Sequence, residues 1–218
     1  MRLYVIRHGE TEYNEKSLLQ GQTDAELNAL GRRLAVLTGD AMKKEGIRFD
    51  GCVSSPLMRA VHTAEILLER IGQKDLPILR DRRIIEMCIG DWEGKSVLAG
   101  ASDVDPELME RFKHDPIGMP RIPNGETTEE VIRRTREFLD RFPDEHPDGT
   151  WLVSTHGFAV RAMLNSLFPD PADFWQGSVP LNCAVSILDL ENGKWKISAF
   201  DRLYYDRSLA VDRYSGNA

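Results

Sequence analysis

Two apolar runs of this chain end in a His-Gly pair, and two arginines are predicted to lie near them. His8 directly follows Arg7 at the end of the first run, and His156 closes a second run. A third run, residues 49–54, leads into a segment that carries Arg59. Ligands of parallel α/β sheets bind beyond the carboxyl ends of the strands, so these four side chains are expected at one edge of a sheet. One strand-end histidine would be ordinary, but four converging polar groups predict a site.

The residue types of this cluster suit phosphate or another oxyanion. A guanidinium stays charged and offers a planar fork that matches phosphate or carboxylate oxygens. A helix predicted to begin near Gly157 adds backbone N–H groups and the positive end of its dipole. An imidazole, with an unperturbed pKa near 6.5, is largely neutral near pH 7, so one of the two histidines could attack phosphorus. The leaving oxygen then needs a proton, and Glu86, in the loop after the third strand-like run, is the best placed acid.

The elements that must position these groups alternate between strands and helices. Short apolar runs predict strands at Leu3–Ile6, Phe49–Ser54, Pro77–Leu79, Trp151–Ser154, Ala184–Leu190 and Trp195–Phe200. Helical spacing predicts helices over 28–46, from 56 onward, over 108–113, over 128–142 and over 157–167, with a turn over 143–149. This alternation indicates an α/β fold with a mostly parallel sheet. An Asn-Gly turn at residues 192–193 predicts that the last two strands are antiparallel.

Composition and charge exclude several classes of protein. A chain of 218 residues with 41% hydrophobic residues is expected to form a single domain, residues 1–218. The 28 Lys and Arg against 35 Asp and Glu give a net charge of −7, which argues against a nucleic-acid partner. No apolar run approaches the roughly 18 residues of a membrane span or forms a signal-peptide core, so a cytoplasmic protein without a membrane partner is expected. Three cysteines without Cys-x-x-Cys spacing argue against disulfides and a thiolate zinc site.

Five blocks of residues, in this order, resemble the signature of a known family. They are Arg7-His8-Gly9-Glu10-Thr11 with Asn14, Gln20-Gly21 and Asp24; Ser54-Ser55-Pro56-Leu57-x-Arg59-Ala60-x-x-Thr63-Ala64; Glu86-x-x-x-Gly90-x-Trp92-Glu93-Gly94; Pro123-x-Gly125-Glu126-Thr127; and Val153-Ser154-x-His156-Gly157. Together they resemble the histidine phosphatase superfamily, also called the phosphoglycerate mutase-like family. A lone Arg-His-Gly occurs often by chance, whereas five ordered blocks between residues 2 and 160 are specific.

The resemblance implies a fold and a set of roles. The implied fold is a three-layer sandwich, in which helices cover both faces of a mostly parallel central sheet with one antiparallel strand. The resemblance implies that His8 is the phosphorylated nucleophile and that Glu86 is the proton donor. It implies that the phosphoryl oxygens are bound by Arg7, Arg59 and His156, with further contacts from Asn14, Gln20 and the backbone N–H of Gly157. It implies neither a metal ion nor a cofactor.

Some positions depart from the family pattern. Leu18 stands where many members place an arginine, and Phe158 stands where a second glycine is common. Both lie beside the implied phosphate pocket, so they bear on the identity of the substrate and leave the reaction unchanged. Glu126 is available as a second acid or as a charge at a helix N-terminus. The arginines of residues 133–136 alternate with glutamates and predict a solvated helix face.

The leading interpretation is a phosphomonoester hydrolase whose partner is a small phosphorylated metabolite. The Gly-Asp-Trp-Glu-Gly sequence soon after Glu86 is typical of the phosphatases, whereas mutases usually carry a longer segment there and an extended tail. A cofactor-dependent phosphoglycerate mutase and a non-catalytic binder of phosphorylated ligands are the alternatives. A zinc hydrolase with His8, His156 and Glu86 as ligands is disfavoured, because two nearby arginines would repel the cation.

Residues 96–123 are the candidate lid or specificity segment. Apolar residues of this segment could either roof the pocket or pack into the core; they are Val97, Leu98, Met109, Phe112, Ile117 and Met119. The sequence names neither the substrate nor the oligomeric state.

Overall fold

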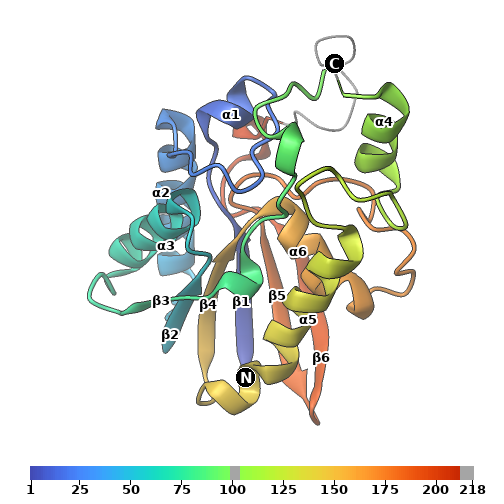
Figure 1. Ribbon diagram of the computed structural model, residues 1–218. Helices are drawn as coiled ribbons and strands as arrows, with labels where there is room; N and C mark the ends of the chain where they lie inside the picture. Colours follow the sequence, from blue (N-terminus) through green and yellow to red (C-terminus); the bar gives the residue numbers. More distant parts are fainter. Residues whose placement is uncertain (99–103, 212–218) are drawn as a thin grey trace.

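A six-stranded mixed sheet runs through the middle of the structure, a computed structural model that describes residues 1–98 and 104–211 (Figure 1). Its strands are β1 (Arg2–Arg7), β2 (Gly51–Ser54), β3 (Ile78–Arg80), β4 (Thr150–Thr155), β5 (Val185–Glu191) and β6 (Lys194–Arg202), in the order β3-β2-β4-β1-β5-β6. The first four in this order are parallel, and β5 runs antiparallel to both of its neighbours. The predicted α/β fold, with a mostly parallel sheet and one antiparallel strand, is confirmed.

Helices cover both faces of the sheet. They are α1 (Glu12–Glu15), α2 (Ala29–Lys44), α3 (Met58–Ile71), α4 (Pro106–His114), α5 (Thr128–Glu145) and α6 (Gly157–Leu164), with 3-10 turns η1 (Arg82–Ile84), η2 (Gly90–Trp92), η3 (Asn165–Leu167) and η4 (Arg207–Leu209). In Figure 1, α2 and α3 lie beside the sheet on the left, and α5 and α6 lie against its other face. This arrangement is the expected three-layer sandwich.

The two outer layers are held by alternate residues of the central strands. Tyr4 and Ile6 of β1 belong to the core cluster that α2 and α3 close, whereas Leu3 and Val5 belong to the cluster closed by α5 and α6. Successive side chains of a strand point to opposite faces, so one strand serves both cores. Burying a side chain of this size stabilises the fold by about 1.5–3 kcal/mol. The position of β1 and β4 at the centre of the sheet therefore follows from their continuous apolar sequence.

The end of α5 corrects a prediction from the sequence. The sequence predicts an end near Phe142 before a turn, but the helix continues through Pro143 to Glu145. A proline inside a helix leaves the carbonyl four residues earlier without its donor. Here that carbonyl belongs to Leu139, and it accepts a hydrogen bond of 3.0 Å from the indole Nε1 of Trp195 on β6. A donor from the neighbouring sheet thus replaces the missing backbone bond, which no local sequence pattern could reveal.

The segments beyond the carboxyl ends of the parallel strands form a third core cluster. It combines residues of α4 with residues of the segments 87–97, 117–122 and 174–175, and Phe158 of α6 packs into it. Figure 1 shows α1 and α4 at this end of the sheet. Among the described helices, none is both long enough and apolar enough to cross a membrane.

Candidate active site

His8 and His156 meet where β1 and β4 end side by side. The two strands are paired in parallel with Arg7 opposite Thr155, so the residues that follow them are neighbours. The imidazole centroids lie 5.2 Å apart, and both side chains are almost fully buried. The His-Gly pairs thus stand together at the carboxyl edge of the sheet, as predicted from the sequence.

The protonation of His8 is fixed by a carbonyl oxygen. Its Nδ1 lies 2.7 Å from the backbone oxygen of Gly9, and a carbonyl can only accept, so Nδ1 carries the proton. Burial lowers the pKa of His8 well below its usual value, and the charges of Arg59 and Arg7 lower it further. His8 is therefore neutral near pH 7, with the lone pair on Nε2.

Close packing of α2 holds the backbone that presents His8. A Cβ on Gly9 would lie 2.6 Å from the carbonyl oxygen of Gly31, so a larger residue could not fit without moving the helix. The backbone N–H of Gly9 donates to Thr63 Oγ1 of α3 at 3.0 Å. The nucleophile candidate is thus fixed between two helices, as a reactive group on a rigid scaffold should be.

His156 carries its proton on the other nitrogen. Its Nδ1 accepts a hydrogen bond from Arg59 Nε at 3.2 Å, so Nε2 holds the proton and donates to Ser55 Oγ at 2.7 Å. Burial, followed by the charge of Arg59, lowers the pKa of His156 well below its usual value. His156 is not among the residues that line the pocket. It contacts Arg59, which does line the pocket, through the bond to Nδ1.

Both arginines are anchored by backbone carbonyls. Arg59, near the start of α3, is fully buried and donates to the carbonyls of Gly21 and Thr23 at 2.7 Å each. Arg7 donates to the carbonyl of Pro180. With five N–H donors each, guanidinium groups can hold such carbonyls and also contact an oxyanion.

Three residues shape the polar end of the pocket around these arginines. A Cβ on Gly157 would lie 3.2 Å from Val179 Cγ1 and 3.4 Å from Arg7 Nε, so the Arg7 side chain lies against the start of α6. Asn14 and Gln20 line the same end of the pocket, and Gln20 Oε1 accepts from Thr11 Oγ1 at 2.9 Å.

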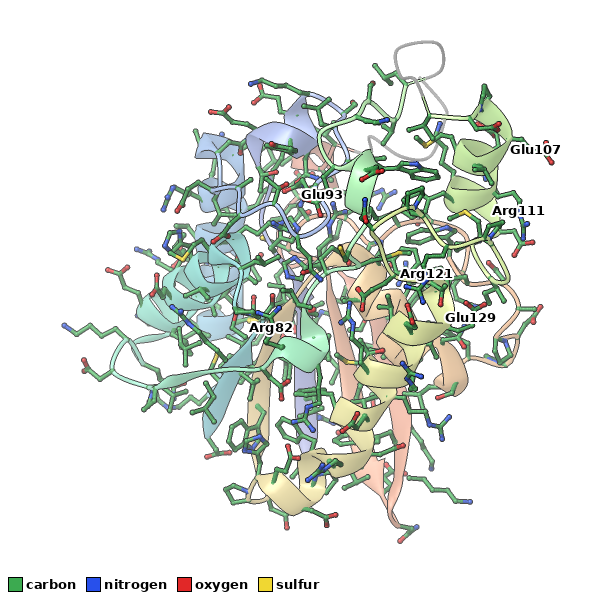
Figure 2. The ribbon with its side chains drawn as sticks, viewed as in Figure 1. Arg82, Glu93, Glu107, Arg111, Arg121 and Glu129 are labelled. Atoms are coloured by element: carbon green, nitrogen blue, oxygen red, sulfur yellow. The ribbon has the colours of Figure 1, made fainter. Side chains whose placement is uncertain are left out.

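Glu93 holds the loop whose carbonyls bind Arg59. Its two carboxylate oxygens accept from the backbone N–H of Gln22 at 2.9 Å and from Thr23 Oγ1 at 2.6 Å. Figure 2 shows Glu93 at this end of the molecule, above the ends of the strands. Glu93 of the Trp-Glu-Gly block therefore holds in place the loop that binds Arg59, a role that the sequence alone does not reveal.

Glu86 reaches the first turn of α6. Its carboxylate accepts from the backbone N–H of Met87 at 2.9 Å, of Ala159 at 3.2 Å and of Phe158 at 3.3 Å. Burial raises the pKa of Glu86, although these donors and the nearby arginines oppose the shift. A raised pKa shifts the carboxyl toward its protonated form, which favours a role as general acid.

Arg134 lies directly behind Glu86, contrary to the predicted solvated face. Its guanidinium donates to the carbonyls of Arg83, Ile85 and Glu86 at 2.9, 2.6 and 3.1 Å. One signal in the sequence could have identified it: Arg134 follows Val131 by three residues and precedes Phe138 by four, so it borders the buried stripe of α5.

Glu126 is the ionic partner of Arg134. The two side chains form a bidentate pair at 2.9 and 3.0 Å, and Glu126 also accepts from the backbone N–H of Cys88 at 2.8 Å. The N-cap of α5 is Thr127, which forms a capping box with Glu130. Glu126 is therefore neither the cap of this helix nor a lining residue of the pocket.

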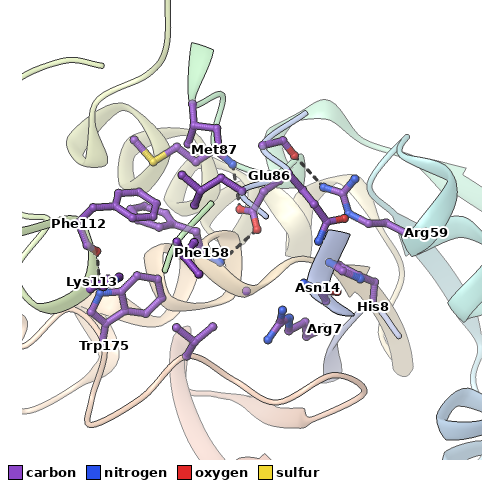
Figure 3. A pocket seen from close by; sticks show the side chains of 17 residues that line it. Arg7, His8, Asn14, Arg59, Glu86, Met87, Phe112, Lys113, Phe158 and Trp175 are labelled. Atoms are coloured by element: carbon purple, nitrogen blue, oxygen red, sulfur yellow. Dashed lines mark hydrogen bonds between the residues drawn. The ribbon is translucent and has the colours of Figure 1, made fainter. Parts of the chain in front are cut away.

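One pocket is lined by most of the predicted site residues (Figure 3). Its polar end is lined by Arg7, His8, Asn14, Gln20, Gly21, Arg59, Glu86 and Gly157, and its other walls by Leu19, Met87, Ile89, Val97, Phe112, Lys113, Phe158, Trp175 and Val179. Figure 3 shows Glu86, Arg7 and His8 around one common space. All of the predicted site residues except His156 line it. In the described parts of the chain, no three His, Cys, Asp or Glu side chains are grouped so that they could hold a metal ion.

The candidate specificity segment contributes only part of the wall. Val97 and Phe112 line the pocket together with Lys113, whereas Met109 and Met119 are buried in the third core cluster. Leu98 is 55% exposed. Residues 99–103 of this segment lie outside the described residues.

Comparisons with known proteins connect this chain to a family. The sequence model of the histidine phosphatase superfamily (branch 1) matches residues 3–202. The chain is 31% identical over 199 residues to phosphoglycerate mutase-like protein 4 of Arabidopsis thaliana, covering 91% of this chain and 84% of that protein. It is 33% identical over 197 residues to the uncharacterized phosphatase PhoE of Bacillus subtilis (strain 168), covering 90% and 92%. Among solved structures, Bacillus stearothermophilus YhfR superposes with a TM-score of 0.80 at 29% identity, over 91% of this chain and 95% of that chain.

Proposed function

The chain belongs to the histidine phosphatase superfamily (branch 1), and from this membership and the pocket we propose that it hydrolyses small phosphate monoesters through a phosphohistidine at His8. One observation carries the proposal. An imidazole with its lone pair on Nε2 and a carboxyl whose pKa is raised by burial line the same pocket. Attack on phosphorus requires the lone pair, and the raised pKa favours the protonated carboxyl that a leaving oxygen requires.

The reaction proceeds in two steps. In the first, His8 Nε2 forms a bond to phosphorus, the phosphorus–oxygen bond to the leaving group breaks, and Glu86 gives its proton to the leaving oxygen. In the second, water attacks the phosphohistidine, the Glu86 carboxylate takes a proton from that water, and His8 recovers its lone pair as inorganic phosphate leaves. Glu86 thus acts as acid and then as base.

The phosphoryl oxygens are held by cationic and amide groups. Arg7 and Arg59 neutralise the charge of the phosphoryl group, and Asn14, Gln20 and the backbone N–H of Gly157 add hydrogen bonds. The two guanidiniums supply the positive charge that a metal ion would otherwise provide, so the reaction needs no metal or cofactor. A chelator should therefore leave turnover unchanged, and loss of activity that zinc or magnesium restores would contradict this.

His156 belongs to the same group but acts through Arg59. Both of its ring nitrogens are engaged, Nδ1 by Arg59 and Nε2 by Ser55. Direct contact with a phosphoryl oxygen, which the family resemblance implies, would need one of these bonds to open. The geometry favours a role in which His156 fixes the plane of the Arg59 guanidinium.

The experiment that tests the proposal compares hydrolysis with transfer. The purified protein is given nitrophenyl phosphate, a panel of metabolite phosphates, and 3-phosphoglycerate with 2,3-bisphosphoglycerate, and inorganic phosphate and 2-phosphoglycerate are measured. We expect inorganic phosphate to be released in step with the alcohol, and the His8→Ala variant to release none. Conversion of 3- to 2-phosphoglycerate with little free phosphate would identify a mutase instead. Binding of phosphate esters without any turnover would identify a non-catalytic binder.

A further inference from the structure

Beyond its polar end, the pocket is walled by apolar side chains. Eight of the nine described residues that line these walls are apolar; they are Leu19, Met87, Ile89, Val97, Phe112, Phe158, Trp175 and Val179. The ninth is Lys113, whose ammonium lies 3.7 Å from Glu110. We call this part of the pocket the apolar chamber.

The aromatic rings of the apolar chamber are fixed by one another. Phe112 and Phe158 are stacked with centroids 5.7 Å apart, and the Trp175 ring stands perpendicular to Phe158 at 5.3 Å. The indole N–H of Trp175 donates to the backbone carbonyl of Phe112 at 3.2 Å. The polar atom of Trp175 is thus already used, and its ring offers a ligand apolar surface.

We infer that the leaving group of the substrate is apolar, so that the preferred substrates are aryl or short alkyl phosphate monoesters. This inference rests on the proposed function and names its substrate class. A sugar or glycerol phosphate would place hydroxyls against carbon, where an unpaired hydroxyl typically lowers affinity about tenfold. Each methylene of an alkyl group that is buried there should raise kcat/KM about fourfold.

Matched pairs of esters test the inference. Propyl phosphate and glycerol 1-phosphate have the same carbon chain and differ by two hydroxyls, and methyl to butyl phosphate form a graded series. We expect kcat/KM to rise about fourfold per methylene and propyl phosphate to exceed glycerol 1-phosphate by at least tenfold. Equal or better hydrolysis of glycerol 1-phosphate would overturn the inference while leaving the proposed function intact. Absence of turnover with every ester, nitrophenyl phosphate included, would overturn both.

Two neighbouring residues supply variants for the same test. Val97 is buried and lines the chamber, whereas Leu98 is exposed. Val97→Thr adds a hydroxyl to the wall at nearly constant volume, so the preference for propyl over glycerol phosphate should fall at least threefold. Leu98→Thr is the control and should leave the preference unchanged. An unchanged preference in Val97→Thr, or an equal fall in both variants, would show that the chamber does not contact the leaving group.

A different observation concerns the segment that carries Glu86. Residues 82–88 contain one 3-10 turn and belong to none of the strands, so no strand pairing fixes the backbone of Glu86. Instead Arg134 holds the carbonyls of Arg83, Ile85 and Glu86, and Glu126 holds the backbone N–H of Cys88. Arg134 and Glu126 also form a bidentate ion pair with each other. This pair links the hydrogen bonds before Glu86 in the chain to the one that follows it.

We propose that Arg134, together with Glu126, is a positioning residue for the proton donor. The guanidinium supplies donors in several directions from one rigid plane, and a lysine ammonium cannot reproduce this set. Without the hydrogen bonds of Arg134, the Glu86 carboxyl should be able to move. Even a small displacement of a positioned acid slows proton transfer. Arg134 itself does not line the pocket.

The test uses the dependence on the leaving group, which a merely structural role would not alter. Arg134→Lys should lower the rate of phosphohistidine formation at least tenfold for alkyl phosphates and much less for nitrophenyl phosphate, because nitrophenolate departs without a proton. In a Glu86→Gln background, Arg134→Lys should cause little further loss. Arg133→Met, at an exposed position of the same helix, is the control. Equal losses on both esters, or the same factor in both backgrounds, would refute the positioning role.

Discussion

His8 and His156 lie with ring centroids 5.2 Å apart and carry their protons on opposite nitrogens. A carbonyl acceptor keeps the proton of His8 on Nδ1, whereas the donor Arg59 keeps the proton of His156 on Nε2. Two His-Gly pairs that look alike in sequence are therefore different in chemistry. His8 offers a lone pair on Nε2 at the pocket, and His156 uses its lone pair to orient a guanidinium.

The pH dependence of the reaction follows from two pKa shifts of opposite sign. Attack needs neutral His8, whose pKa is lowered, so the rate should fall only when acid protonates it. The leaving group needs protonated Glu86, whose pKa is raised, so the rate falls as base removes that proton. We expect the acid limb of the kcat profile to lie below the ordinary histidine pKa of about 6.5 and the basic limb to lie above the ordinary glutamic acid pKa of about 4.3. Glu86→Gln should remove the high-pH decline on the same substrate, and an unchanged decline would assign it to another group.

Replacement of Glu86 should affect poor leaving groups most. Glu86→Gln keeps the shape of the side chain but cannot donate the carboxyl proton, and removal of a positioned acid typically costs about 10² to 10⁴ in rate. Phosphohistidine formation from an alkyl phosphate should show this loss in single turnovers, whereas nitrophenyl phosphate should keep much of its rate. Equal losses on both esters would show that Glu86 serves mainly to hold the start of α6.

Arg59 should not tolerate lysine. The guanidinium holds the carbonyls of Gly21 and Thr23 and the imidazole of His156 at the same time, which a single ammonium cannot do. We expect Arg59→Lys to lower kcat/KM at least tenfold, although the charge is retained. The control is Arg33→Lys at an exposed position of α2, which should change nothing. Near-normal turnover of Arg59→Lys would mean that only its charge matters.

The proline inside α5 gives a prediction about stability. Trp195→Phe removes the donor to the Leu139 carbonyl, and leaving this acceptor unpaired should lower the free energy of unfolding by about 1–2 kcal/mol. Pro143→Ala provides a backbone N–H that can bond the same carbonyl. In the Pro143→Ala background, Trp195→Phe should lower the free energy of unfolding by less. Denaturant unfolding of the wild type, the two single variants and the double variant measures this difference. An identical cost with and without Pro143 would show that the indole stabilises the fold only through packing.

The sequence predicted which residues gather at the site better than it predicted the hydrogen bonds that hold them in place. Ligands of parallel sheets bind beyond the carboxyl ends of the strands, and this rule predicted that Arg7, His8 and Arg59 lie together. The prediction was possible because the positions of strand ends follow from apolar patterning. The bonds of His156 to Arg59 and Ser55 could not be predicted, since they join three separate elements. The same holds for the bonds of Arg134 to backbone carbonyls that lie about fifty residues earlier in the chain. Patterning determines which face of an element is buried, whereas hydrogen-bond partners depend on how the elements pack.

The whole proposed reaction depends on the phosphorylation of His8 Nε2. It is tested most directly by mixing the protein with phosphate ester labelled in its phosphoryl group, quenching within milliseconds, and following the label on the protein. Phosphoramidates are labile in acid and stable in alkali, so the label should show this behaviour, reside on the peptide that contains His8, and be absent from His8→Ala. Label of the same stability on His8→Ala, or turnover of the wild-type protein without any trapped label in single-turnover conditions, would contradict the account.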